Sequence, residues 1–169
     1  MFVQGGSYLW VDGDTVKAVS KRIREELRQN PNIKNIGIGS GGGRGRIEKA
    51  VMAGILVREH GISTQVTGVC IGECSIFFWG RINRTVFRPY PRFGVHKIAI
   101  NGETVPAGDP IYSLVLDYAR EMGVGPNFIV TEMQTWEPNE IGYLTDEQAC
   151  LSGSDIWYQV GFCSYYSGK

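Results

Sequence analysis

Asn35-Ile36-Gly37-Ile38-Gly39-Ser40-Gly41-Gly42-Gly43 opens the stretch that decides the fold, because a short apolar strand runs directly into a loop of glycines. Apolar residues at helical spacing follow from Ile47 to Ile55, and Thr64–Thr67 is typical of a second strand. A strand, a helix and a strand in this order predict a parallel pair joined by a right-handed crossover. The sequence therefore indicates an α/β fold.

The glycine loop has three possible roles. Glycines between a strand and a helix let the backbone turn tightly and expose N–H groups, which can hold a phosphate or a developing oxyanion. Gly37, Gly39 and Gly42 also match the G-x-G-x-x-G of dinucleotide-binding proteins, but Glu59 ends a helix where the ribose-binding acid should end a strand. Nucleotide binding, an oxyanion site and a purely structural turn are the alternatives.

Hydrophobic spacing and capping residues predict the remaining elements. Asp109-Pro110 places a capping side chain and a proline at a helix start, and Thr145 with Gln148 forms a capping box. In chain order the predictions are a strand at 8–11, a helix with core residues at 16–27, a buried helix at 76–80, strands at 85–87 and 93–96, a polar loop at 99–108, helices at 109–123 and 127–133, and an edge strand or subunit contact in the aromatic tail at 156–166.

Composition and charge limit the function classes. The 169 residues favour one domain, and 17 basic side chains balance 17 acidic ones, so nothing indicates a nucleic-acid partner. No apolar run is long enough to span a bilayer, and the N-terminus lacks the features of a signal peptide. The protein is expected in the cytoplasm, or in the periplasm if a signal peptide has been removed.

Cysteines, histidines and one glutamate are candidates for chemistry. Cys70 and Cys74 are four residues apart and are expected as free buried thiols, although an oxidising compartment could link them. His96 follows an apolar strand, a position that suits either a general base or a packed side chain. His60 beside Gly61 is typical of a cation at a helix C-terminus, and Glu73 near a helix N-terminus is favoured by the helix dipole alone.

These motifs, in this order, resemble the Clp-protease/crotonase superfamily, and most closely the Clp-protease-like periplasmic serine-peptidase-type proteins. The glycine loop resembles the family's Ser-Pro-Gly-Gly loop. Cys70-Ile71-Gly72-Glu73-Cys74 stands where that group has a Cys-Ala-Ser-Ala-Cys type sequence with the nucleophile. Phe93-Gly94-Val95-His96 resembles its Gly-x-His strand, and Tyr143-Leu144-Thr145-Asp146-Glu147 its Leu-Thr-x-Glu-Glu helix start. The resemblance covers about residues 8–153 of a single domain, 1–169, and leaves out the tail 154–169.

The resemblance implies a spiral of short strands with flanking helices, assembly into homo-oligomers, and peptide-bond hydrolysis by a serine, a histidine and an acid. Carried over by position, Gly42 and Gly43 would donate N–H groups to an oxyanion hole, and His96 would be the base. These groups are expected to surround one cleft together with the nucleophile position. The acid stays open among three glutamates of the corresponding region: Glu137, which is the tentative choice, Glu132 and Glu140.

The departures from the family pattern bear on activity. The nucleophile position holds Gly72, which has no attacking group, and Gly41 replaces the proline of the loop. Ser75 is a possible substitute if the turn is shifted, and Cys70 and Cys74 flank the position.

Two functions are therefore predicted. The first is a Clp-protease-like serine peptidase homologue with a degenerate nucleophile position, whose active version would use Ser75 or a cysteine with His96. The alternative is a non-catalytic module of the same fold for peptide binding or assembly. The expected partners are a peptide or protein substrate and further copies of the chain, and no cofactor or metal ion is expected.

Overall fold

The structure is a computed structural model that describes residues 2–12, 19–42, 46–80, 83–86, 92–145, 147–148 and 156–158. Its largest sheet has six strands in the order β1-β2-β3-β4-β6-β11. Apart from the antiparallel β1–β2 hairpin, neighbouring strands in this sheet are parallel. The strands are β1 (Phe2–Gly5), β2 (Tyr8–Val11), β3 (Asn35–Ile38), β4 (Ser63–Val66), β6 (Arg84–Val86) and β11 (Ile156–Tyr158).

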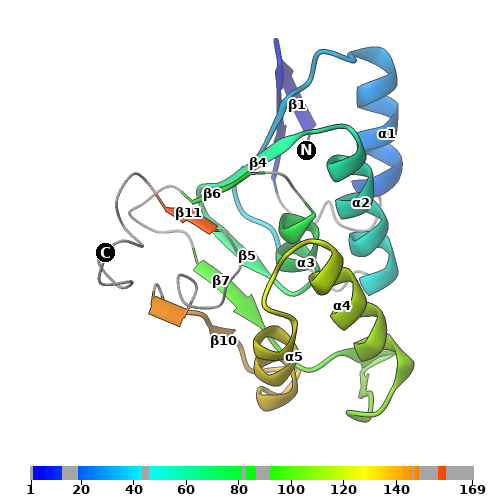
Figure 1. Cartoon of the computed structure of the whole chain (residues 1–169), viewed down its shortest axis with the longest axis vertical. Helices are drawn as coiled ribbons and strands as arrows, with labels where there is room; N and C mark the ends of the chain where they lie inside the picture. The colour runs from blue at the N-terminus through cyan, green and yellow to red at the C-terminus, as the bar shows by residue number, and fades with distance from the viewer. Residues whose placement is uncertain are drawn as a thin grey trace.

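Two smaller sheets and five helices complete the described part of the chain. A three-stranded sheet has the order β10 (Gly142–Tyr143), β7 (Arg92–Val95) and β5 (Val69–Ile71), and a two-stranded sheet pairs β8 (Ala99–Ile100) with β9 (Glu103–Thr104). In Figure 1, α1 packs beside α2, α2 beside α3 and α4, and α4 beside α5. The helices are α1 (Val19–Gln29), α2 (Ile47–Glu59), α3 (Glu73–Trp79), α4 (Pro110–Glu121) and α5 (Pro126–Thr135).

The predicted elements with strong local signals are confirmed. The Asp109 carboxylate accepts a hydrogen bond from the Ile111 amide at 2.9 Å, and Pro110 begins α4. Thr145 and Gln148 form the predicted capping box, with each side chain accepting from the other residue's amide. β11 is the predicted edge strand of the tail, although residues 159–169, with Phe162, Tyr165 and Tyr166, lie outside the described residues.

Other predictions are corrected by the structure. The predicted polar loop at 99–108 contains the β8–β9 hairpin, whose turn is Asn101-Gly102 with φ values of 55° and 89°. Asn-Gly is the strongest short signal for such a turn. The buried helix starts at Glu73, which the sequence places near a helix N-terminus, and it extends N-terminally beyond the apolar residues 76–80; all seven of its residues are buried. Strands β5 and β10 were not predicted, because two or three residues carry no periodic pattern.

Two glycines set the contact between α2 and α3. A β-carbon placed on Gly80, at the end of α3, would lie 2.2 Å from the Gly54 Cα in α2. A β-carbon on Gly54 would lie 1.7 Å from the Tyr118 hydroxyl of α4, and that hydroxyl donates to the Ile76 carbonyl at 3.0 Å. The three helices therefore meet at a point where no side chain fits on either glycine.

The buried Arg84 ties β6 to the ends of two helices. Its guanidinium donates to the Trp79 carbonyl, at 3.1 Å from Nε and 3.0 Å from Nη2, and also to the Met122 carbonyl. Trp79 ends α3 and Met122 caps α4. A cation at a helix C-terminus is favoured by the helix dipole and satisfies carbonyls that have no partner within the helix. Arg84 thus fixes α3, on which the candidate site depends.

Candidate functional site

Gly41, Gly72 and His96 lie at or just beyond the ends of three neighbouring parallel segments. β5 pairs with β7 in parallel, with Ile71 opposite Gly94, so Gly72 and His96 both follow the carboxyl ends of neighbouring strands. On the other side of β5, Gly41 forms a parallel bridge with Cys70. Ligands of α/β proteins bind outside the carboxyl ends of parallel strands. The glycine loop, the Gly72 turn and the end of β7 therefore form the candidate site.

Gly72 makes the sharp turn between β5 and α3. Its backbone has φ 58° and ψ −119°, a conformation that glycine adopts readily and that L side chains rarely take. Its amide donates to the Gly94 carbonyl at 2.9 Å, and its own carbonyl accepts from the Ile76 amide at 3.3 Å. A strained strand-to-helix turn is the conformation that presents a nucleophile in many hydrolases. In this chain the turn is made by Gly72, which has no side chain.

The glycine loop lies directly on this turn. The Gly41 amide donates to the Val69 carbonyl at 2.7 Å, and the Gly41 carbonyl accepts from the Ile71 amide at 2.9 Å. A β-carbon on Gly42 would be in ordinary contact, 3.7 Å, with the Ile71 side chain. Gly42 is half-buried, and no hydrogen-bond acceptor for its amide is found among the described residues. Gly43 lies outside the described residues.

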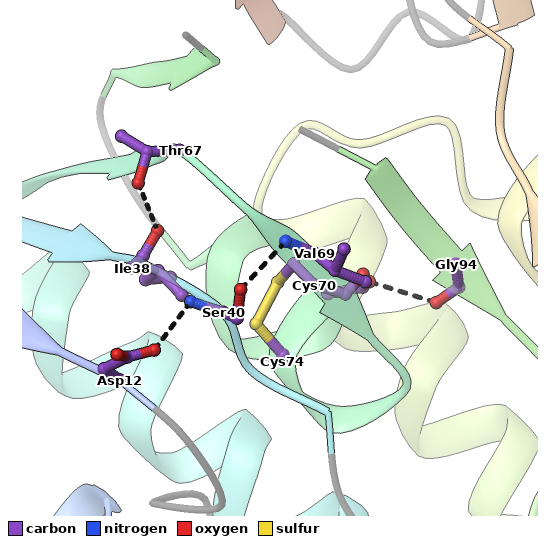
Figure 2. The surroundings of a disulfide bond; sticks show 9 residues. Asp12, Ile38, Ser40, Thr67, Val69, Cys70, Cys74 and Gly94 are labelled. Atoms are coloured by element: carbon purple, nitrogen blue, oxygen red, sulfur yellow. Dashed lines mark hydrogen bonds between the residues drawn. A yellow bond between two sulfur atoms is a disulfide. The ribbon is translucent and has the colours of Figure 1, made fainter. Parts of the chain in front are cut away.

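Two contacts that the sequence did not indicate anchor the loop. The Ser40 amide donates to the Asp12 carboxylate at 3.0 Å, and the Ser40 hydroxyl accepts from the Val69 amide at 3.4 Å (Figure 2). Asp12 follows β2 and is distant in sequence, so only the pairing of β2 with β3 brings it to the loop. No local pattern could have identified it.

Ser75, the possible substitute nucleophile, points into the protein. Its side chain is 1% exposed, and its hydroxyl is within hydrogen-bond distance of the carbonyls of Cys70 (2.9 Å) and Gly94 (3.2 Å). Both acceptors are backbone groups of β5 and β7. Ser75 therefore joins α3 to the two strands that end at the site through its buried hydroxyl.

Cys70 and Cys74 form a disulfide, with their Cα atoms 5.2 Å apart. The expectation of free buried thiols is therefore wrong for this structure. The pair spans Gly72, with one sulfur in β5 and the other in the first turn of α3 (Figure 2). In this state neither residue offers a thiolate, which is the reactive form of cysteine.

His96 is half-buried just beyond β7. Its Nδ1 lies 2.8 Å from the Lys97 carbonyl oxygen. A carbonyl can only accept a hydrogen bond, so Nδ1 is the donor in this contact. The contact that orients the His96 ring is therefore with a backbone carbonyl rather than with a carboxylate.

The candidate acids have other partners. Glu137, the tentative choice, accepts a hydrogen bond from the Lys97 ammonium. Glu132 accepts from the Trp136 indole at 3.3 Å, and Glu140 accepts from the Glu137 amide at 3.3 Å. Glu137 therefore pairs with Lys97, the residue that follows His96. Among the described residues, no hydrogen bond joins Glu137 to His96 itself.

The remaining candidates have local roles. The His60 Nδ1 lies 2.8 Å from the Leu56 carbonyl at the C-terminal end of α2, the position that the sequence suggested. Glu73 is the first residue of α3 and is 7% exposed, next to Gly72. No helix among the described residues is long and apolar enough to cross a membrane.

Comparisons with known proteins identify solved structures of a similar fold, but no curated protein of similar sequence. No protein-family model and no curated protein sequence matches the chain. A mutant of the 1510-N membrane-bound stomatin-specific protease, in complex with a substrate peptide, has a TM-score of 0.62 and 13% identity, over 94% of this chain and 77% of that one. ClpP1 from Listeria monocytogenes has a TM-score of 0.63 and 14% identity, over 88% of each chain.

A third solved structure with a similar fold is described as a different kind of enzyme. A putative enoyl-CoA hydratase from Streptomyces avermitilis has a TM-score of 0.60 and 12% identity, over 97% of this chain and 68% of that one. The chain therefore has the mixed α/β fold of the Clp-protease/crotonase superfamily, as the sequence motifs predicted.

Proposed function

From this fold and the glycine-lined turn, we propose that the chain is a Clp-protease-like serine peptidase homologue that binds peptides without hydrolysing them. The main support for the proposal is that none of the candidate nucleophiles presents a free hydroxyl or thiol. Gly72 has no side chain, the Ser75 hydroxyl is buried against two carbonyls, and Cys70 and Cys74 are joined to each other. Loss of a triad nucleophile removes most of the catalysis and leaves binding and oxyanion stabilisation.

A backbone amide next to the Gly72 turn supports a peptide as ligand. The Gly42 amide is free of acceptors within the described residues, and it lies against Ile71, the neighbour of Gly72. A fixed backbone N–H can donate a hydrogen bond to a ligand oxygen and stabilise the bound ligand without any rearrangement of the protein. The solved structure of the stomatin-specific protease, which has a similar fold, contains a substrate peptide, and this supports a peptide as the ligand class.

A second function of the same fold, an assembly module, is favoured by a different observation. Among the described residues, three large apolar side chains are exposed around β10: Trp136, Ile141 and Tyr143, at 37–40%. Exposed apolar groups that lie close together are typical of protein contacts. Assembly into a homo-oligomer stays a prediction that is compatible with peptide binding.

The peptide-binding proposal is tested with a matched pair of variants at Gly42. Gly42→Pro removes the N–H group, whereas Gly42→Ala keeps it and adds only an ordinary contact with Ile71. We expect the wild type and Gly42→Ala to bind short unstructured peptides with equal affinity. Gly42→Pro is expected to bind about tenfold more weakly, since one lost hydrogen bond is worth about 1–1.5 kcal/mol.

Fluorescence polarisation with labelled peptides measures the affinities, and circular dichroism checks that both variants are folded. Equal affinity of the two folded variants would show that the Gly42 amide does not contact the ligand. Absence of binding to the wild type itself would reject peptide binding and leave the assembly module.

A further inference from the structure

The disulfide encloses the turn on which the candidate site is built. Cys70 is the central residue of β5, and Cys74 is the second residue of α3, so the covalent link closes around Gly72. Figure 2 shows the link between the strand and the helix, with Ser40 on one side of β5 and Gly94 on the other. The bond therefore restrains the angle at which α3 leaves β5.

The glycine loop also rests on this disulfide. A β-carbon placed on Gly41 would lie 2.9 Å from the Cys74 Sγ and 3.3 Å from the Cys74 Cβ, so the loop fits only because Gly41 has no side chain. The same residue exchanges two backbone hydrogen bonds with β5. The position of Gly42, which follows directly, thus depends on the position of the Cys74 sulfur.

The surroundings leave little room for two separate thiols. Cys70 is 0% exposed and Cys74 is 2% exposed, and both belong to the main hydrophobic core. Two non-bonded sulfurs need more space than two bonded ones, and a close-packed interior supplies that space only by moving a neighbour. On the side of Cys74 the neighbour is Gly41, so separation of the sulfurs displaces the glycine loop.

We propose that the Cys70–Cys74 disulfide is a redox-sensitive positioning element that holds the glycine loop and the Gly72 turn in their ligand-binding arrangement. A dithiol reductant supplies two electrons and two protons. The S–S bond breaks, two protein thiols form, and the reductant is oxidised to its own disulfide. The oxidised protein binds peptide and the reduced protein binds it weakly. The ligand part of this inference rests on the proposed function.

Binding and reduction are then linked in both directions. If the disulfide form binds peptide more tightly, bound peptide must favour the disulfide by the same factor. A saturating peptide is therefore expected to shift the midpoint of reduction toward a higher ratio of reduced to oxidised dithiothreitol. The shift provides a readout that a purely structural disulfide would not give.

The experiment compares the full chain in oxidised and reduced dithiothreitol. Hydrogen exchange, measured without peptide, is expected to rise on reduction in residues 39–42 and 69–74 and to stay constant in α1. Peptide affinity, measured by fluorescence polarisation, is expected to fall about tenfold or more, the size of a typical coupling between two sites. Mass spectrometry after alkylation confirms that Cys70 and Cys74 carry the new thiols.

A double variant, Cys70→Ala with Cys74→Ala, is the matched control because it retains Cys150 and Cys163, which lie outside the described residues. Its hydrogen exchange and peptide affinity are expected to match those of the reduced wild type and to be the same with and without the reductant. If this variant does not fold, the hydrogen exchange and peptide affinity of the oxidised and reduced wild type are sufficient to test the proposal.

Unchanged exchange in residues 39–42 upon full reduction would overturn the positioning role. Increased exchange in a protein that binds no peptide in either state would reject the proposed function and leave the positioning role intact. Equal peptide affinity of both states, with binding present, would overturn the redox control.

Discussion

Gly80→Ala is expected to destabilise the protein by about 3 kcal/mol or more, the upper range for overpacked cores. The added β-carbon would lie 2.2 Å from the Gly54 Cα and 2.4 Å from the Gly54 carbonyl carbon and oxygen. These are backbone atoms in the middle of α2, so no side-chain rotation can relieve the contact. The helices must move apart, which also disturbs the Tyr118–Ile76 hydrogen bond and the core around α3.

Urea denaturation followed by circular dichroism measures this change in the free energy of unfolding. Gly108→Ala is the control, because a β-carbon there meets no atom within 4 Å. It is expected to change stability by no more than about 0.5 kcal/mol. Equal stability of the two variants would mean that α2 and α3 do not cross at these glycines.

Gly72→Ser is expected to create reactivity toward a fluorophosphonate that the wild type lacks. The substitution places a hydroxyl at the turn between the glycine loop and the end of β7, and we expect His96, which follows β7, to act as its base. The backbone at φ 58° and ψ −119° strains any L residue, so we also expect a loss of stability of about 1–3 kcal/mol. Intact-mass spectrometry detects the covalent adduct.

Two further variants separate the causes. Gly72→Ala carries the same backbone strain without a hydroxyl and is expected to remain unlabelled. His96→Ala in the Gly72→Ser background is expected to slow labelling by about a hundredfold, the size of a general-base contribution. A misplacement of the hydroxyl by about one ångström is enough to cost a similar factor. Identical labelling of Gly72→Ser and Gly72→Ala would contradict the placement of Gly72 at the nucleophile position.

The parts of the fold that the sequence predicted are those with local causes. Helices such as α1 and α4 have a buried stripe at helical spacing, and Asp109 and Thr145 mark helix starts by hydrogen bonds that span only a few residues. The motif order from the glycine loop to His96 also predicted which segments meet, since neighbouring parallel strands end at the same edge. The pairing of β5 with β7 and the Gly41–Cys70 bridge agree with that order.

The parts that the sequence did not predict depend on tertiary contacts. The spacing of Cys70 and Cys74 is compatible with both thiols and a disulfide, and only the geometry of the β5–α3 turn brings the sulfurs within bonding distance. The burial of Ser75 follows from the packing of α3 against β5 and β7. Asp12 reaches Ser40 across the pairing of β2 with β3. None of these contacts leaves a pattern in the local sequence.

The most direct test of the central claim is prolonged exposure of the unmodified, oxidised protein to a fluorophosphonate, under conditions in which it binds a peptide. The account predicts an unchanged intact mass and an intact peptide, because Gly72 has no nucleophile and the Ser75 hydroxyl is buried against the carbonyls of Cys70 and Gly94. An adduct that maps to Ser75, and that disappears together with peptide cleavage in Ser75→Ala, would contradict it and make the protein a working hydrolase.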